Sequence, residues 1–193
     1  MFATKVGILI VALKSLIVAQ AAFVCNDRHV LETTQLTTPG SGRAVTVEKF
    51  NCSNSFPTGE LASDIPAGTG TATQVSERAA SQCTTSTCVC GVPCFFQGCG
   101  PVSEPIHGSD CTELGDTLMS NPGTFTITPP VGVAFILETC TYSFLGPSIP
   151  TEYCFDDMGA AALELFAVCG PTQQGSCGGS SGSTEFFINQ ISL

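Results

Sequence analysis

TFTITPPVGVAFILETCTYSFLGPSIPTEYCFDDMGAAALELFAVC, residues 124–169, contains the two periodicities that decide the fold. Thr124–Thr128 alternates between polar and apolar residues, as a half-buried strand does, and two prolines end it. A longer strand is expected over 133–144. Asp157–Cys169 instead has apolar residues at helical spacing, with acidic residues that favour a helix N-terminus. The stripe predicted to be buried on this helix consists of Met158, Ala161, Ala162, Leu165, Phe166 and Cys169.

A further helix and a last strand flank this stretch. Asp110 and Glu113 match a capping box, which predicts a helix ending near Ser120. Asp156 is expected to cap the helix at 157–169 in the same way. The glycine- and serine-rich residues 175–183 predict a flexible loop. The first helix is expected to bury Cys111, Leu114 and Leu118, and a last strand over Thr184–Ser192 to turn Phe186 and Ile188 inward.

The order helix, strand, strand, helix, strand predicts an α+β fold. We expect a disulfide-rich two-layer sandwich, with an antiparallel sheet and two helices on one face, over residues 105–193. Residues 22–104 are rich in Thr, Ser, Gly and Pro, which predicts a loop-rich, cysteine-stapled region joined covalently to this core. Within it, 43–50 is the one strand expected and 76–82 a short helix.

Residues 1–21 have the pattern of a cleavable signal peptide. Lys5 provides a positive charge, 6–18 is a mostly apolar run, and Ala19-Gln20-Ala21 provides small residues that predict cleavage before Ala22. The apolar run is too short for a transmembrane helix and contains Lys14. The sequence therefore predicts a secreted, extracellular protein without stable insertion in a membrane.

The charge of the chain excludes one class of partner. Six basic and 16 acidic residues give −10, and loss of Lys5 and Lys14 with the signal peptide gives −12. Such a surface repels phosphate backbones and anionic lipid, so no nucleic-acid partner is expected. An extracellular protein or a glycan is the partner class that stays open, and composition says nothing about the oligomeric state.

All 12 cysteines follow the signal peptide, and their even number in a secreted chain predicts disulfides. Residues 105–193 contain five of them, so complete pairing requires at least one bridge to the residues before 105. Sequence does not specify the pairing. The cysteines are Cys25, Cys52, Cys83, Cys88, Cys90, Cys94, Cys99, Cys111, Cys140, Cys154, Cys169 and Cys177.

Five of these cysteines lie within residues 83–99, where a metal site is the alternative to disulfides. The segment lacks paired C-x2-C knuckles and contains no histidine, and an oxidising compartment would convert the thiols to disulfides. Disulfides are therefore predicted and no metal. Asn51 is in the one Asn-x-Ser/Thr sequon of the chain, which makes it a candidate glycosylation site, although a disulfide at Cys52 would compete.

No catalytic motif stands out. The chain has two histidines, His29 and His107, and no G-x-S-x-G elbow. His107 with a nearby carboxylate is the candidate for a hydrolase site, but a triad requires convergence in space. Asp156-Asp157 is better explained by helix capping than by a glycosidase pair. The sequence contains neither a calcium-binding loop nor a G-x-G-x-x-G phosphate cradle, so no cofactor is expected.

A family resemblance rests on the run D110-C111, F125-T126-I127, T139-C140-T141-Y142-S143-F144, Y153-C154-F155-D156-D157, C169, C177-G178-G179 and F186-F187-I188. It resembles the C-terminal region of small secreted cysteine-rich proteins of mushroom-forming fungi. More distantly, it is similar to fungal necrosis-inducing effectors and killer-toxin-like proteins. The resemblance covers residues 108–193 and implies an α/β sandwich with a non-enzymatic secreted role.

Three functions follow as hypotheses. The first is a non-catalytic, effector- or toxin-like protein that binds an extracellular protein or glycan. The second is a secreted hydrolase that uses His107 with a nearby carboxylate. The third is a structural protein of a cell wall or matrix.

Overall fold

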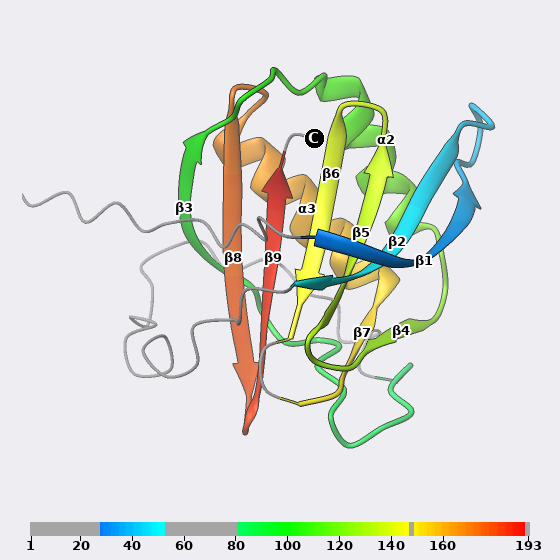
Figure 1. The fold of residues 1–193 in the computed structure, drawn as a ribbon, viewed down its shortest axis with the longest axis vertical. Helices are drawn as coiled ribbons and strands as arrows, with labels where there is room; N and C mark the ends of the chain where they lie inside the picture. Colours follow the sequence, from blue (N-terminus) through cyan, green and yellow to red (C-terminus); the bar gives the residue numbers. More distant parts are fainter. Residues whose placement is uncertain (1–27, 53–80, 147–148, 192–193) are drawn as a thin grey trace, which may run out of the picture.

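The computed structural model describes residues 28–52, 81–146 and 149–191, which form an α+β fold (Figure 1). The predicted signal peptide at 1–21, Cys25, and most of the helix expected at 76–82 lie outside these residues. The strands are β1 (Arg28–Thr37), β2 (Ala44–Cys52), β3 (Phe95–Pro101), β4 (Thr124–Ile127), β5 (Val131–Leu137), β6 (Cys140–Leu145), β7 (Thr151–Cys154), β8 (Gln173–Ser181) and β9 (Thr184–Ile191), and the helices are α2 (Gly108–Met119) and α3 (Phe155–Cys169).

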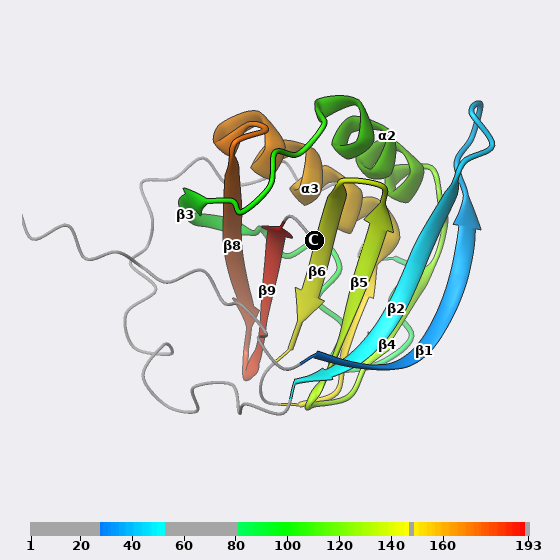
Figure 2. The same cartoon turned by 45° about the horizontal axis from the view of Figure 1, so that its top comes forward.

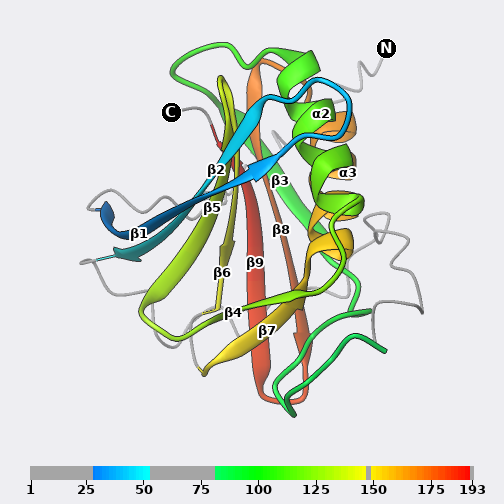
Figure 3. The same ribbon diagram turned by 90° about the vertical axis from the view of Figure 1, so that its right-hand side faces the viewer.

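Seven strands form one antiparallel sheet in the order β1-β2-β5-β6-β9-β8-β3. Both helices lie on the same face of this sheet (Figure 3). Strands β4 and β7 form a separate antiparallel pair. The predicted disulfide-rich α+β fold, with two helices on one face of an antiparallel sheet, is therefore confirmed. The expectation of one strand before residue 105 is wrong, because β1 and β3 also lie there and complete the sheet together with β2.

The main core lies between the sheet and the two helices. Helix α2 buries Cys111, Leu114 and Leu118 there, as the sequence predicts. The stripe of α3 is also buried, except that Phe166 is half-buried. The helices pack closely because a Cβ at Gly159 would lie 2.6 Å from the backbone of α2. From β9, Phe186 and Ile188 are fully buried in this core, which confirms the orientation predicted for them.

A smaller apolar cluster lies on the opposite face of the sheet. Phe50, Ala134, Leu145 and Phe187 are buried there, with Ile136 packed against them. The central strands consequently bury side chains on both faces. This explains why β6 is buried at all six positions instead of alternating.

Two of the predicted strand boundaries are wrong. The single strand expected over 133–144 is a hairpin, β5 and β6, which turns at Glu138 in a left-handed conformation (φ 49°). The loop expected over 175–183 is almost entirely strand β8, paired with both β9 and β3. Its glycines provide space: a Cβ at Gly179 would lie 2.5 Å from the Phe186 ring, and one at Gly175 would lie 2.8 Å from the sulfur of Cys169.

The capping predictions also fail. Helix α2 begins after His107 and α3 after Cys154, and neither of these residues makes a capping side-chain hydrogen bond. Asp110 and Glu113 instead bind Arg43 from the β1–β2 turn. Asp156 accepts hydrogen bonds from Gln82 and from the backbone of Asp157. Tertiary partners therefore take the carboxylates of Asp110 and Glu113, whereas Asp156 shares its carboxylate between Gln82 and the backbone of its own helix.

Candidate functional site

The most exposed secondary structure is β1, at one edge of the sheet (Figure 2). Eight of its ten residues are exposed, although Leu36, near the turn, packs against the main core. Val30 is 49% exposed and the adjacent Leu31 is 60% exposed. Strand β1 pairs with β2, and no other described strand pairs with it. Its outer edge therefore presents backbone hydrogen-bonding groups beside two exposed apolar side chains.

The first residues of β1 are attached to β2 by side-chain contacts. Arg28 makes an ion pair with Glu48 and lies over the Phe50 ring, 4.6 Å from its centroid. Lys49 on β2 binds Glu32 on β1 at 2.8 Å. Because β2 also pairs with β5, the edge is part of the sheet rather than a loose arm.

The turn at the other end of the hairpin is attached to α2. Arg43 binds Asp110 at 2.9 Å and Glu113 at 2.8 Å, and Ser41 donates a hydrogen bond to Glu113. Burial alone would raise the pKa of Asp110, but hydrogen bonds from Thr139 and Arg43 outweigh it and hold this pKa below its usual value. Asp110 is therefore an ionised anchor, and β1 is fixed at both ends.

The opposite edge of the sheet, β3, is less open to pairing. It contains a bulge between Phe96 and Gly98, and Pro101 cannot donate a backbone hydrogen bond. A disulfide from Cys99 attaches it to α3. By comparison, β1 has one bulge between Val30 and Glu32, and its sequence contains no proline.

The structure does not assemble the histidine candidates into one site. His107 is 71% exposed, and its Nδ1 lies 4.0 Å from Asp110 Oδ2. That oxygen already accepts hydrogen bonds from the backbone and hydroxyl of Thr139. His29 lies in β1, nine residues and therefore about 30 Å along the strand from the turn beside α2. The two histidines thus lie far apart.

A shallow groove of about 520 Å³ runs along α2 beside the β1–β2 turn. His107 is not among its lining residues, so the groove would not bring a substrate to this histidine. The groove is lined by Pro39, Ser109, Thr112, Glu113, Asp116, Thr117 and Ser120.

Asp156 and Asp157 point toward different partners. Asp156 accepts a hydrogen bond from Gln82 at 3.0 Å, whereas Asp157 accepts one from the backbone of Gly91 at 2.7 Å. Burial raises the pKa of Asp157 to about 6, the Gly91 N–H opposes this shift, and Asp156 adds to it. The pair therefore anchors the turn at residues 81–92, and the two carboxylates do not face a common substrate position.

The raised pKa of Asp157 has a measurable consequence. Since the folded-state pKa is above that of the unfolded chain, ionisation of Asp157 destabilises the fold as pH rises from about 4 through 6. Asp157→Asn keeps an oxygen for Gly91 and removes this penalty. We expect the variant to be more stable at pH 7 by about 1 kcal/mol, or about 2–4 °C in Tm, with no gain at pH 4. Thermal unfolding at the two pH values measures this, and equal or lower stability at pH 7 would contradict it.

Five disulfides join ten of the cysteines, which confirms the expected disulfide bonding. They are Cys83–Cys88, Cys90–Cys154, Cys94–Cys177, Cys99–Cys169 and Cys111–Cys140. Three of them cross from the segment 83–99 to the residues after 105 and join the two regions into one unit. The five cysteines within residues 83–99, for which a metal site was the alternative, all form disulfides.

Asn51 lies in β2 and is half-buried between β1 and β5. Its Oδ1 is buried and accepts no hydrogen bond from the described part of the chain. Cys52 is the residue that follows Asn51 in the sequon. The side chain of Cys52 and the whole of Cys25 lie outside the residues that the structure describes. Glycosylation at Asn51 stays a prediction.

No protein-family model, curated protein or solved structure matches the chain. The resemblance to fungal secreted proteins consequently stays a prediction. No described helix has the length and apolar character needed to cross a membrane.

Proposed function

We propose that this protein is secreted and non-catalytic, and that it acts in an effector- or toxin-like manner by binding an extracellular protein. The single observation that carries the proposal is the exposed edge of β1. The bound segment of the partner would be an extended strand that adds to the sheet beside β1.

The chemistry of the edge supports strand addition. Backbone groups along ten residues provide hydrogen bonds for an added strand, and Val30 and Leu31 provide apolar contacts at one end. Anchors at both ends hold β1 in the extended conformation before binding, which lowers the entropy lost on association. The strongly acidic mature chain favours a neutral or basic partner.

Selection from a phage library of random ten-residue peptides tests the proposal. We expect enriched peptides to be extended and to bind the wild type, and the double variant Val30→Lys/Leu31→Lys to lose at least about tenfold in affinity, because two charges replace apolar contacts at the edge. The matched control is Met119→Lys/Val168→Lys, which changes two equally exposed apolar residues on the helices.

Backbone amide shifts measured by NMR locate the bound peptide. Shifts concentrated in β1 support the proposal. Equal binding by both double variants, or shifts confined to another surface, would overturn it. Binding on a glycan array that is unaffected by the β1 variant would favour a carbohydrate ligand instead.

A hydrolase is the second candidate, favoured by the 4.0 Å separation of His107 and Asp110. Because Asp110 is occupied by Arg43 and Thr139, we expect no turnover of a panel of chromogenic ester, peptide and glycoside substrates. Hydrolysis that is lost in His107→Ala, with the fold intact by circular dichroism, would establish the hydrolase and displace the binding proposal.

A further inference from the structure

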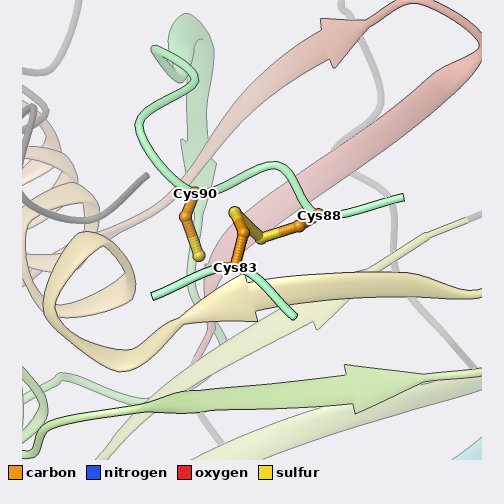
Figure 4. A group of neighbouring side chains, drawn as sticks. All are labelled: Cys83, Cys88 and Cys90. Carbon is orange, nitrogen blue, oxygen red and sulfur yellow. A yellow bond between two sulfur atoms is a disulfide. The ribbon is translucent and has the colours of Figure 1, made fainter. Parts of the chain in front are cut away.

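Two disulfides meet at the turn formed by residues 81–92. The sulfur atoms of Cys83, Cys88 and Cys90 all lie within 4.8 Å of one another (Figure 4). Cys83 and Cys88 are bonded to each other, and Cys90 is bonded to Cys154. Sulfurs this close are near enough for thiol–disulfide exchange after a small rearrangement, since exchange requires a thiolate to reach a disulfide sulfur.

The two disulfides differ in their accessibility. Cys83 and Cys88 are half-buried and packed over the inner pair, whereas Cys90 is 6% exposed and Cys154 is fully buried. A reducing agent in solvent therefore reaches the outer bond first. Reduction of the inner bond by direct attack would require the turn to open.

We propose that reduction of the Cys83–Cys88 disulfide leads, by thiol–disulfide exchange, to cleavage of the buried Cys90–Cys154 disulfide. In the first step, a dithiol reductant of the thioredoxin class gives two electrons to Cys83–Cys88. The reductant becomes a disulfide, and Cys83 and Cys88 become thiols.

In the second step, the thiolate of Cys83 attacks the sulfur of Cys90. A Cys83–Cys90 bond forms, the Cys90–Cys154 bond breaks, and Cys154 leaves as a thiolate without any further change in oxidation state. Cys83 is the attacking residue because six residues separate it from Cys90, enough chain to close a disulfide. One residue separates Cys88 from Cys90, which leaves little freedom to satisfy disulfide geometry.

Asp157 is placed to give a proton to the leaving thiolate. Its carboxylate oxygen, the sulfur of Cys90 and the sulfur of Cys154 all lie within 4.8 Å of one another. The charge of Asp156 raises the pKa of this carboxyl further, and both carboxyls in turn raise the pKa of the buried Tyr153. With its pKa raised to about 6, a large fraction of Asp157 carries a proton in mildly acidic surroundings, and the proton moves readily to a thiolate of higher pKa.

The exchange changes what holds the turn. Cys90–Cys154 links the turn covalently to the junction of β7 and α3, whereas the new Cys83–Cys90 bond lies within the turn. After exchange, the turn is held to Glu152 and Asp157 by hydrogen bonds. The switch therefore converts a cross-linked segment into one that can detach.

The test uses the oxidised full-length protein, graded dithiothreitol, alkylation of thiols and disulfide mapping by mass spectrometry. We expect Cys88 and Cys154 to be alkylated together, with a Cys83–Cys90 linked peptide, while the buried Cys94–Cys177 and Cys111–Cys140 bonds persist. Alkylation of Cys83 and Cys88 with Cys154 still protected would overturn the proposal. This measurement requires no variant.

Two single variants separate the roles of the outer cysteines. Cys88→Ala leaves the Cys83 thiol, and we expect Cys154 to become alkylated without any reductant. Cys83→Ala leaves the Cys88 thiol, and we expect about tenfold less labelling of Cys154. Equal labelling in the two variants would contradict the assigned attack by Cys83. Asp157→Asn should slow the labelling of Cys154 at pH 6 and leave that of Cys88 unchanged.

Discussion

Glu152→Gln is expected to lower the free energy of unfolding by about 2 kcal/mol at pH 7, because the amide places N–H groups against other donors. Glu152 is fully buried, and its carboxylate accepts hydrogen bonds from the backbone of Thr84 at 3.1 Å, the Thr84 hydroxyl at 2.8 Å and the backbone of Thr85 at 2.7 Å. The glutamine side chain has the same shape, but its single amide oxygen can accept only some of these hydrogen bonds. Denaturant unfolding measures the loss.

The same residue predicts a dependence on pH. Burial would raise the pKa of Glu152, but hydrogen bonds from Thr85, Thr124 and Thr84 outweigh it and lower this pKa to about 2. Since the folded-state pKa is below the unfolded value of 4.5, the carboxylate stabilises the fold above pH 4.5, and this contribution is lost as pH falls toward 2. The difference between wild type and Glu152→Gln should therefore shrink on acidification.

Glu104→Gln is the control for this experiment, because Glu104 is exposed. It should unfold like the wild type at each pH. If Glu104→Gln and Glu152→Gln gave the same loss, or if the loss from Glu152→Gln were constant from pH 7 to pH 3, the assigned role of the buried carboxylate would be wrong.

Removal of the Cys94–Cys177 disulfide is expected to cost about 3 kcal/mol, or about 6–12 °C in Tm. The two cysteines are 83 residues apart in sequence, but the Cys99–Cys169 bond shortens the loop that they close to about 13 residues. Both cysteines are 1% exposed, so Cys94→Ala/Cys177→Ala also loses packing in the main core. Thermal unfolding of the double variant measures the sum.

The comparison is Cys83→Ala/Cys88→Ala, which removes a bond between half-buried residues five apart. Its loss should be smaller, because the loop is shorter and the two cysteines lie outside the main core, packed only against Cys90 and Cys154. A larger loss of stability from Cys83→Ala/Cys88→Ala than from Cys94→Ala/Cys177→Ala would contradict the prediction that the Cys94–Cys177 bond contributes more to the stability of the fold.

Helix positions could be predicted from the sequence because helical periodicity reflects burial against one layer. Leu114 on α2 and Leu165 on α3 follow it, and both lie in the core. The capping residues could not be predicted, since Arg43 is 67 residues from Asp110 in the chain and competes with the local backbone for the carboxylate. Local rules fail where a distant charged residue is the stronger partner.

Strand β8 could not be predicted from the sequence, for a different reason. Gly178 and Gly179 are typical of loops, but here they make room for the rings of Phe187 and Phe186 on the paired strand. That requirement depends on which strands are neighbours, and periodicity within one segment contains no information about neighbours. The turn between β5 and β6 was missed because apolar residues continue on both sides of Glu138.

The candidate binding edge, β1, could not be predicted from the sequence either. RHVLETTQLT has no sustained alternation because eight of its ten residues are exposed, so no buried stripe marks it as a strand. Its partner β2 was predicted, within two residues of its bounds, because Val45 and Phe50 are buried. The even cysteine count indicated disulfides and a bridge between the halves, but the pairing required the fold.

The three long-range disulfides impose an order on biosynthesis. If the chain is secreted, as proposed, it enters an oxidising compartment from its N-terminus, and Cys90, Cys94 and Cys99 arrive before their partners at 154, 177 and 169 have been synthesised. During this interval, Cys83–Cys88 is the one native bond that the segment 83–99 can form within itself. Any other pairing there must be undone by isomerisation once the last 40 residues are present, so the yield of native protein should depend on a disulfide isomerase.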